Sequence, residues 1–251
     1  MEQKKKNTSV GKTSILLLAI LFSSNYWGQV ITSGKINYER RTNLIKKIGD
    51  PRMADRIPKD QRIVKENFIL TFNQKNSSFK PIIDDVPQER GWVKYLTSQN
   101  TYYQDLGKNE QVMLLSFAGK EVPIKDSLPI RKWKITNKKR TIGGYECRRA
   151  IYEKNDSTRI YAWFSDEITP SVGPEGFCGL PGTILGIATE DGGIVYFASK
   201  IEGTKVDKEE FKYDLGKKKV FTLKEFKDKI EKEYSNTRWG KGLYENLFRW
   251  L

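Results

Sequence analysis

The sequence predicts a mainly β protein of the α+β class, built on one antiparallel meander sheet that is either open or curved into a half-open barrel. Short runs with alternating apolar and polar residues follow one another closely through most of the chain, which is typical of strands. After Gly91 these runs are joined by turn residues and not by long helices, so hairpins are favoured over βαβ units. Clear helical periodicity returns only near the C-terminus, where we expect an amphipathic helix.

The first 28 residues have the pattern of an export signal. Four lysines precede the apolar run 15–22, which is too short to span a bilayer of about 30 Å as a helix. We expect cleavage between Gly28 and Gln29, and the alternative is a retained anchoring helix. Residues 29–251 are then expected to form a single domain, since neither an internal repeat nor a low-complexity linker divides them.

Strand patterns begin soon after this segment. Ile36 and Tyr38 alternate with polar residues, and Phe68, Leu70 and Phe72 share one face of a second run. Residues 112–117 form a nearly continuous apolar run of strand length, and residues 132–136 alternate again around Trp133 and Ile135. The stretches between them, 40–62 and 77–89, contain prolines and many polar residues, so we expect loops there, with a short frayed helix as the alternative in the first.

Two hairpins are predicted in the second half of the chain. Residues 146–152 and 159–165 flank Lys-Asn-Asp-Ser, and residues 183–189 and 194–201 flank Glu-Asp-Gly-Gly. Asn, Asp and Gly tolerate the left-handed backbone of a tight turn. Both pairs of runs are therefore expected to fold back on themselves.

The C-terminal region combines a helix start signal with a helical apolar face. Thr222 and Glu225 have the spacing of a capping box. The apolar residues that follow at spacings of three and four are Leu223, Phe226, Ile230 and Tyr234. Residues 239–251 have similar spacing and many aromatic side chains. They are expected to form either a second short helix or an exposed aromatic edge.

Composition excludes several kinds of chemistry. The chain has no histidine among its 251 residues, which rules out catalysis that depends on imidazole and zinc sites that use it. Its net charge is +14, and +11 remains once the four lysines and one glutamate of the signal segment are removed. An exported basic protein is not expected to meet nucleic acid, and anionic surfaces in the envelope are the matching partners.

The two cysteines, Cys147 and Cys178, are predicted to form a disulfide. An even number of cysteines in an exported protein favours a bridge, which would close a loop of about 30 residues and contribute about 3.5 kcal/mol. The alternative is a pair of thiolates that binds copper(I) or performs redox chemistry. Otherwise neither a cofactor nor a metal is expected.

The segment 173–185 is rich in glycine and proline around bulky apolar residues, so it should form a stiff loop that enters a strand. Its spacing matches neither phosphate-binding fingerprint. Two uses are open: the loop only turns the chain, or it lines an apolar pocket. The candidate lining residues are Trp163, Phe177, Leu180, Pro181 and Ile184.

With these features the chain resembles the GLPGLI family of exported bacterial proteins. The resemblance rests on the hexapeptide 179–184, the Gly-Pro that precedes it, Ala162-Trp163, and the Gly-Tyr-Glu-Cys at 144–147. One position departs from the family pattern, because Thr183 stands where the family has its second leucine. The resemblance implies a mostly β fold and a place in the periplasm or at the outer membrane, with no established activity.

We therefore expect an exported, non-catalytic envelope protein that binds an apolar ligand, a lipid or a client peptide. The first alternative is an accessory subunit of an outer-membrane complex or transporter, which docks through its basic surface and the aromatic edge 239–251, with peripheral contact to the outer membrane. The second is a hydrolase that uses the adjacent carboxylates Asp84-Asp85 or Asp166-Glu167. Neighbouring residues on a strand point to opposite faces, so these pairs share chemistry only in a turn.

Overall fold

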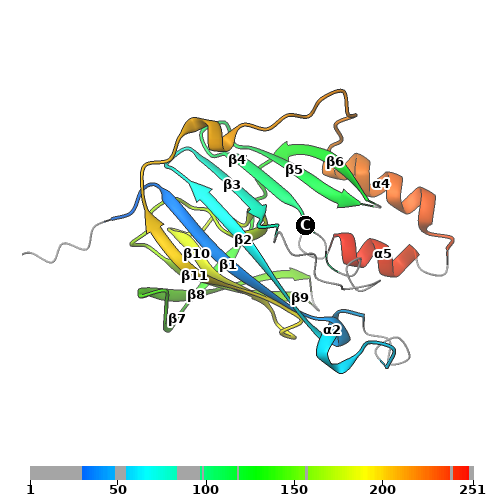
Figure 1. Ribbon diagram of the computed structural model, residues 1–251, viewed down its shortest axis with the longest axis horizontal. Helices are drawn as coiled ribbons and strands as arrows, with labels where there is room; N and C mark the ends of the chain where they lie inside the picture. The colour runs from blue at the N-terminus through cyan, green and yellow to red at the C-terminus, as the bar shows by residue number, and fades with distance from the viewer. Residues whose placement is uncertain are drawn as a thin grey trace, which may run out of the picture.

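The structure, a computed structural model, describes residues 30–48, 55–83, 97, 99–117, 119–155, 158–237 and 240–248. Within these ranges eleven strands form one sheet (Figure 1). The strands are β1 (Gly34–Asn43), β2 (Ile63–Phe72), β3 (Asn76–Pro81), β4 (Thr101–Asp105), β5 (Glu110–Phe117), β6 (Lys120–Ser127), β7 (Trp133–Ile142), β8 (Tyr145–Asn155), β9 (Thr158–Ser165), β10 (Thr183–Thr189) and β11 (Ile194–Gly203). The helices are α2 (Leu44–Ile48), α4 (Leu223–Tyr234) and α5 (Gly240–Leu247), with 3-10 turns η1 (Lys59–Gln61), η3 (Pro174–Gly176) and η4 (Lys208–Phe211).

The sheet consists of two antiparallel meanders joined side by side. Its strand order is β6-β5-β4-β3-β2-β1-β11-β10-β9-β8-β7. The first meander runs outward from β1 to β6, and the second returns from β7 to β11, which pairs with β1. All ten neighbouring pairs are antiparallel. The predicted fold class is confirmed.

A short connection between the two edge strands shows that the sheet is strongly curved. β6 ends at Ser127 and β7 begins at Trp133, although they lie at opposite edges of the sheet. Six Cα steps span at most about 20 Å, so these two strand ends lie no farther apart than that. Among the described residues no ladder joins β6 to β7. The sheet is therefore a half-open barrel with one gap in its wall.

The inner face of this barrel carries the hydrophobic core. Along β1 the residues at even positions from Gly34 to Thr42 are buried, while those between them are partly or fully exposed. Phe68 and Phe79 stack across β2 and β3 with 5.0 Å between ring centroids. Burial of each such ring contributes roughly 2–3 kcal/mol, so the inner face is the main source of stability.

The predicted hairpins and the C-terminal helix are confirmed. β8 pairs with β9 and β10 with β11, as the turn residues indicated. At the start of α4 the Glu225 amide donates to the Thr222 hydroxyl at 3.2 Å, and the Thr222 amide donates to the Glu225 carboxylate at 2.8 Å. Phe226 and Ile230 on the apolar face are buried. Residues 240–247 form α5, so the second short helix is also present.

Two predicted loops contain regular structure instead. Residues 40–43 continue β1, which was not predicted, whereas the short helix α2 that follows is the alternative that the sequence left open for this stretch. Residues 77–81 belong to β3, which pairs with both β2 and β4. In both cases hydrogen bonds to neighbouring strands outweigh the local preference of polar residues and proline for a loop.

Several predictions lie outside the described residues. These are the signal segment 1–28, the acidic pair Asp84-Asp85, and Trp239 with residues 249–251 of the aromatic C-terminal stretch. In the part of the chain that the structure does describe, every helix is too short or too polar to cross a membrane.

Candidate functional site on the inner face of the sheet

The glycine- and proline-rich segment lies on the inner face of the half-open barrel and closes part of it. Its centre is the 3-10 turn η3, in which Glu175 adopts a left-handed backbone with φ of 53°. A Cβ on Gly176 would lie 2.9 Å from the ring of Tyr102 on β4, so the segment packs directly against the sheet. The Gly176 carbonyl accepts a hydrogen bond from Gln104 at 2.9 Å.

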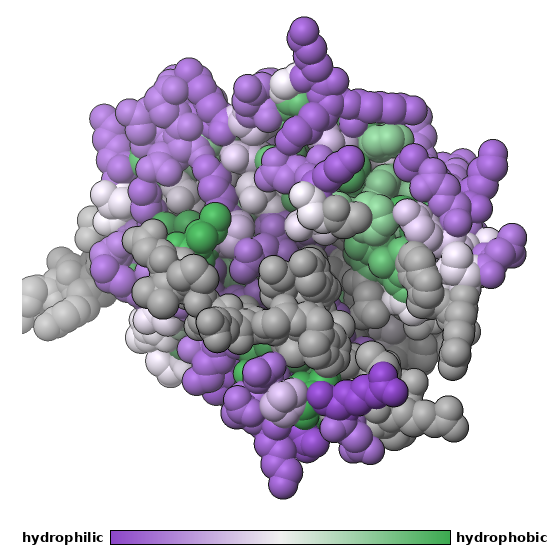
Figure 2. Space-filling model, turned by 45° about the vertical axis from the view of Figure 1, so that its right-hand side comes forward, coloured by the Kyte–Doolittle hydropathy of each residue, from purple (hydrophilic) through white to green (hydrophobic). Residues whose placement is uncertain are grey.

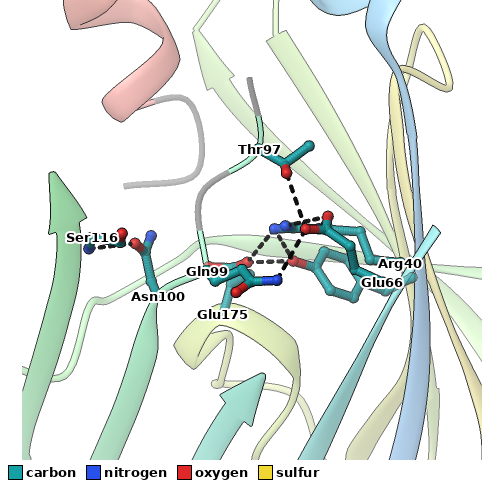
Figure 3. Close-up of polar contacts among 8 residues, drawn as sticks. Arg40, Glu66, Thr97, Gln99, Asn100, Ser116 and Glu175 are labelled. Carbon is teal, nitrogen blue, oxygen red and sulfur yellow. Dashed lines mark hydrogen bonds and ion pairs between the residues drawn. The ribbon is translucent and has the colours of Figure 1, made fainter. Parts of the chain in front are cut away.

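A buried charged cluster holds this turn. It consists of Arg40 on β1, Glu66 on β2, Glu175 in η3 and Tyr196 on β11, all of which are buried. Figure 3 shows the side chains of Arg40, Glu66 and Glu175 pointing toward one another. Arg40 donates to Glu66 Oε2 from Nη2 at 2.6 Å and from Nε at 3.0 Å. Its Nη1 lies 3.4 Å from Glu175 Oε1 and 3.1 Å from the Tyr196 hydroxyl, which itself donates to Glu175.

Glu66 and Arg40 each have further contacts within the core. Glu66 Oε1 accepts from Thr97 at 3.0 Å and from Gln99 at 3.2 Å, so both oxygens of that carboxylate are used. The guanidinium also lies 4.7 Å from the ring centroid of Phe68. Burial by itself lowers the pKa of Arg40, but Tyr196 and the two carboxylates outweigh it and raise the pKa. Arg40 therefore keeps its charge inside the core.

Two oxygen atoms next to the cluster have no hydrogen-bond partner in the described structure, namely Tyr102 Oη and Glu175 Oε2. Both side chains are about 2% exposed or less. Burial first, and then the neighbouring Glu175 carboxylate, raises the pKa of the Tyr102 phenol well above its ordinary value. The phenol is therefore a neutral donor, and Glu175 can accept one more hydrogen bond.

The main role of the cluster is to hold the 3-10 turn η3 against the sheet, because Glu175 bonds to Arg40 and Tyr196. Removing one partner of a buried ion pair leaves an uncompensated charge and typically costs about 3–5 kcal/mol. The sequence reasoning missed this cluster because it placed residues 40–62 in a loop. One signal was present, since Arg40 and Thr42 continue the period-two pattern of Ile36 and Tyr38.

A second feature of the inner face lies at the gap in the barrel wall, where α4 packs against β6 and α5 (Figure 1). On one side of the gap Phe117 of β5 and Tyr234 of α4 have ring centroids 6.2 Å apart. On the other side the centroids of Trp133 and Tyr152, on β7 and β8, are 5.7 Å apart. All four side chains pack on the core but remain only partly buried. Figure 2 shows hydrophobic surface among hydrophilic side chains on this side of the molecule.

The structure does not bring the five predicted pocket residues together as one lining. Phe177, Leu180 and Ile184 belong to the core, with 0–3% exposure. Pro181 is exposed. Trp163 lies on the outer face of β9, opposite to the face of its neighbour Phe164, and its ring is 4.9 Å from the Arg140 guanidinium. The segment therefore serves first as a packed corner.

The two cysteines are both free and buried, so the predicted disulfide is not formed in the structure. Cys147 pairs across the ladder with Arg140, whereas the Cys178 carbonyl accepts from the indole of Trp133, seven residues away along β7. Seven residues span about 20 Å along a strand, so the two cysteines lie against opposite ends of β7. Burial raises the pKa of both thiols, to about 12 for Cys147.

The acidic pair Asp166-Glu167 lies in an exposed turn that follows β9. The Glu167 carboxylate accepts a hydrogen bond from the Glu146 amide at 3.4 Å. The neighbouring Ser165 is buried, and its hydroxyl has no partner among the described residues. These groups do not converge on one point of the inner face.

Comparison with known families gives one partial match. A family model described as "Protein of unknown function (Porph_ging)" matches residues 153–186, which include the end of β8, β9, the glycine- and proline-rich segment and the start of β10. No curated protein matches the sequence.

Two solved structures share the fold at low sequence identity. Two crystal forms of a protein named PNGF-II, in space groups C2 and P21, are 16% and 15% identical to this chain and each has a TM-score of 0.51. The alignments cover 80% and 81% of this chain and 33% and 34% of PNGF-II, so the chain spans about a third of that protein's length. An uncharacterized conserved protein from Thermus thermophilus aligns over 77% of this chain and 92% of its own, with 6% identity and a TM-score of 0.40.

Proposed function

We propose that the protein is an exported, non-catalytic binding protein of the cell envelope, which holds an apolar ligand, a lipid or a client segment at the gap in its barrel. The observation that carries the proposal is the set of partly buried aromatic side chains on both sides of this gap. Aromatic rings provide large apolar contact area, and ligand sites are mostly apolar with few polar groups. Export is supported by the N-terminal sequence pattern.

We also propose that the chain is a GLPGLI-type protein. The hexapeptide 179–184 and its Gly-Pro lie inside the stretch that matches a family of unknown function. In the structure this stretch forms the corner between β9 and β10, and Glu175 attaches it to the sheet. A stiff corner of this kind accounts for a specific glycine and proline pattern without any catalytic role.

Native mass spectrometry of the protein purified from its own envelope tests the binding function. We expect a retained small molecule of apolar character, and a mature N-terminus near residue 29. The delipidated protein should then bind an apolar fluorescent probe such as N-phenyl-1-naphthylamine.

Matched tyrosine variants locate the probe. Tyr244→Ser removes a partly buried ring of α5, whose centroid is 4.8 Å from that of Phe248, at the gap. Tyr213→Ser removes an exposed ring that contacts Tyr103. We expect the first variant alone to weaken probe binding. Absence of both a retained molecule and probe binding, or equal weakening by the two variants, contradicts the proposal.

One feature favours the alternative of an accessory subunit. The edge strand β7 pairs only with β8 among the described strands, and most of its side chains are exposed and several are basic. An open edge can pair with a strand of a partner, although lysines on an edge also protect against unwanted pairing. Co-purification with a membrane complex, lost on charge reversal at Lys134 and Lys138, would support this function over ligand binding.

A further inference from the structure

The two edges of the sheet differ in how the rest of the chain covers them. At β6 the Lys125 amide donates to the Phe221 carbonyl at 2.8 Å, and the Phe221 amide donates to the Pro123 carbonyl at 3.0 Å. At the opposite edge β7 pairs with β8 alone among the described strands, and no other backbone–backbone hydrogen bond of the described chain reaches residues 133–142. An edge strand presents a row of unpaired backbone donors and acceptors. β7 is therefore the edge to which a partner strand can add.

The hairpin that contains this edge is strongly basic. Residues 132–149, which we call the basic hairpin, hold seven lysines and arginines and one glutamate, a net charge of +6. That glutamate, Glu146, is paired with Lys139 at 2.7 Å. Lys134, Lys138 and Arg140 are exposed, and within the described chain none of the three forms an ion pair with a carboxylate. The open edge thus carries cations that an anionic partner can neutralise.

The two faces of β7 differ near the start of the strand. Ile135 lies opposite Ala150, which is fully buried on the inner face, whereas Lys134 lies opposite Ile151. Residues directly opposite each other share a face, and neighbours along a strand point to opposite faces. Ile135 therefore belongs to the inner face and Lys134 to the outer face. Ile135 is nevertheless 38% exposed, so a further strand at this edge meets an apolar side chain on one face and a lysine on the other.

We propose that β7 binds an extended acidic segment of another protein, which adds a strand to the open edge of the sheet. Backbone hydrogen bonds provide the pairing, and carboxylates of the segment approach Lys134, Lys138 and Arg140. Acidic residues that alternate with apolar ones match the two faces of β7. The inference rests on the alternative function of an accessory subunit and names the chemistry of its partner.

Two other occupants fit this edge less well. A second copy of the chain, paired through its own β7, would place basic side chains opposite one another, which is destabilising. β7 also has a register shift between Ile135 and Lys139, and both bulges and lysines protect an edge from unwanted pairing. An anionic bilayer would neutralise the lysines but would leave the backbone groups of the edge without partners. An acidic strand satisfies both the charges and the backbone.

Binding of a synthetic strand tests the inference. The probe is a fluorescently labelled peptide of about ten residues, the length of β7, in which glutamate alternates with valine. One control peptide replaces glutamate with glutamine. The other keeps the glutamates but carries N-methyl groups on alternate amides, which removes backbone donors without changing the charge. Fluorescence anisotropy with the full chain should show that each control binds at least about tenfold more weakly than the parent peptide.

Matched charge reversals assign the binding to the edge. Lys134→Glu combined with Lys138→Glu should weaken binding of the parent peptide by about tenfold, because attraction becomes repulsion. Lys224→Glu combined with Lys232→Glu changes two exposed lysines of α4 by the same total charge, and it should leave the affinity within about twofold. Hydrogen exchange on the wild type should slow at the amides of residues 133–142 when the parent peptide binds, a readout that needs no variant.

The inference has clear contrary results. Equal affinity for the parent and N-methylated peptides overturns it, and so does equal weakening by the two charge reversals. Dimerisation of the free protein that protects the amides of β7 assigns the edge to a second copy and overturns it too. Binding to phosphatidylglycerol vesicles, but not to the peptide, that is lost with Lys134→Glu and Lys138→Glu assigns the lysines to a membrane surface and also overturns it.

Failure of the inference is distinguishable from failure of the function beneath it. If the peptide does not bind, but co-purification with a membrane complex is lost in the Lys134 and Lys138 variant, the accessory function stands and the inference falls. If the peptide does not bind and co-purification is absent or survives in that variant, both fall.

Discussion

Arg40 is charged and 4% exposed, so its two carboxylate partners decide whether the core tolerates it. We predict that Arg40→Met lowers the free energy of unfolding by about 3–5 kcal/mol, because the buried carboxylates of Glu66 and Glu175 then lose their ion pairs with Arg40. Arg41→Met changes the next residue, which is 59% exposed at its side chain, and should cost less than about 1 kcal/mol. Urea unfolding measures the free energy of unfolding of both variants. Equal losses in the two would contradict a stabilising role of the buried cluster.

Lys154 gives a second prediction, which concerns how the free energy of unfolding depends on pH. Its folded pKa of about 8 is below the value of about 10.4 of an unfolded lysine, so the unfolded state binds more protons between these values. The cost of burying its charge is therefore fully present below pH 8 and disappears as the pH rises toward 10.5. Relative to Lys154→Met, the wild type should gain stability between pH 8 and 10.5. Urea unfolding at pH 7 and pH 10 tests this, and a constant difference contradicts it.

The thiols give a third prediction. Thiolates are the reactive form of cysteine, and burial raises the pKa of Cys147 to about 12 and that of Cys178 above its usual value. In the native protein at pH 8 we expect neither to react with dithionitrobenzoate over minutes, and in urea we expect two thiols to react. Peptide mapping that finds Cys147 joined to Cys178, or fewer than two reactive thiols in urea, would contradict this prediction and show that the disulfide forms.

At this scale the sequence shows which side chains are apolar, but not which charged side chain has a buried partner. Arg40 and Glu175 are 135 residues apart, and their contact exists only because the sheet brings η3 beneath β1. Trp163 fails as a pocket residue for a related reason. A large aromatic side chain suits an apolar pocket, but the alternation of side chains along β9 places Trp163 on the outer face, beside Arg140.

Among the elements, the corner before β10 depends on a glycine at position 182. Gly182 has φ of +140°, and a Cβ there would lie 2.1 Å from the Ser165 carbonyl oxygen. We predict that Gly182→Ala lowers the free energy of unfolding by more than about 2 kcal/mol, from backbone strain and the clash together. Gly242→Ala in α5, where a Cβ meets nothing within 4 Å, should be neutral or stabilising. Equal effects of the two changes in thermal unfolding would argue against a rigid corner.

Elements whose signals are local were predictable. The turn residues around 190–193 and the capping box at Thr222 act within a few residues, and both appear as predicted. β3 was not predicted, because its sequence Asn-Ser-Ser-Phe-Lys-Pro has little strand character. It becomes a strand through its hydrogen bonds to β2 and β4 on either side.

For the whole molecule, the sequence predicts a meander but not where the sheet opens. The gap arises because the chain moves from one edge of the sheet to the other through residues 128–132 alone. Nothing in the composition of that connection shows that its neighbours β6 and β7 lie at opposite edges. The position of α4 against β6 and α5 follows from this topology.

One core cluster receives buried side chains from all eleven described strands and from α4, so the two meanders should unfold together. We predict that Leu115→Ala in β5, at 0% exposure, costs about 2–5 kcal/mol. The same change should shift the urea midpoint equally in far-ultraviolet circular dichroism and in tryptophan fluorescence, to which Trp133 and Trp163 of the opposite meander contribute. A fluorescence midpoint that stays in place while the dichroism midpoint falls would show that β1 to β6 and β7 to β11 are separate folding units. Refolding from urea over the same range checks that the transition is reversible.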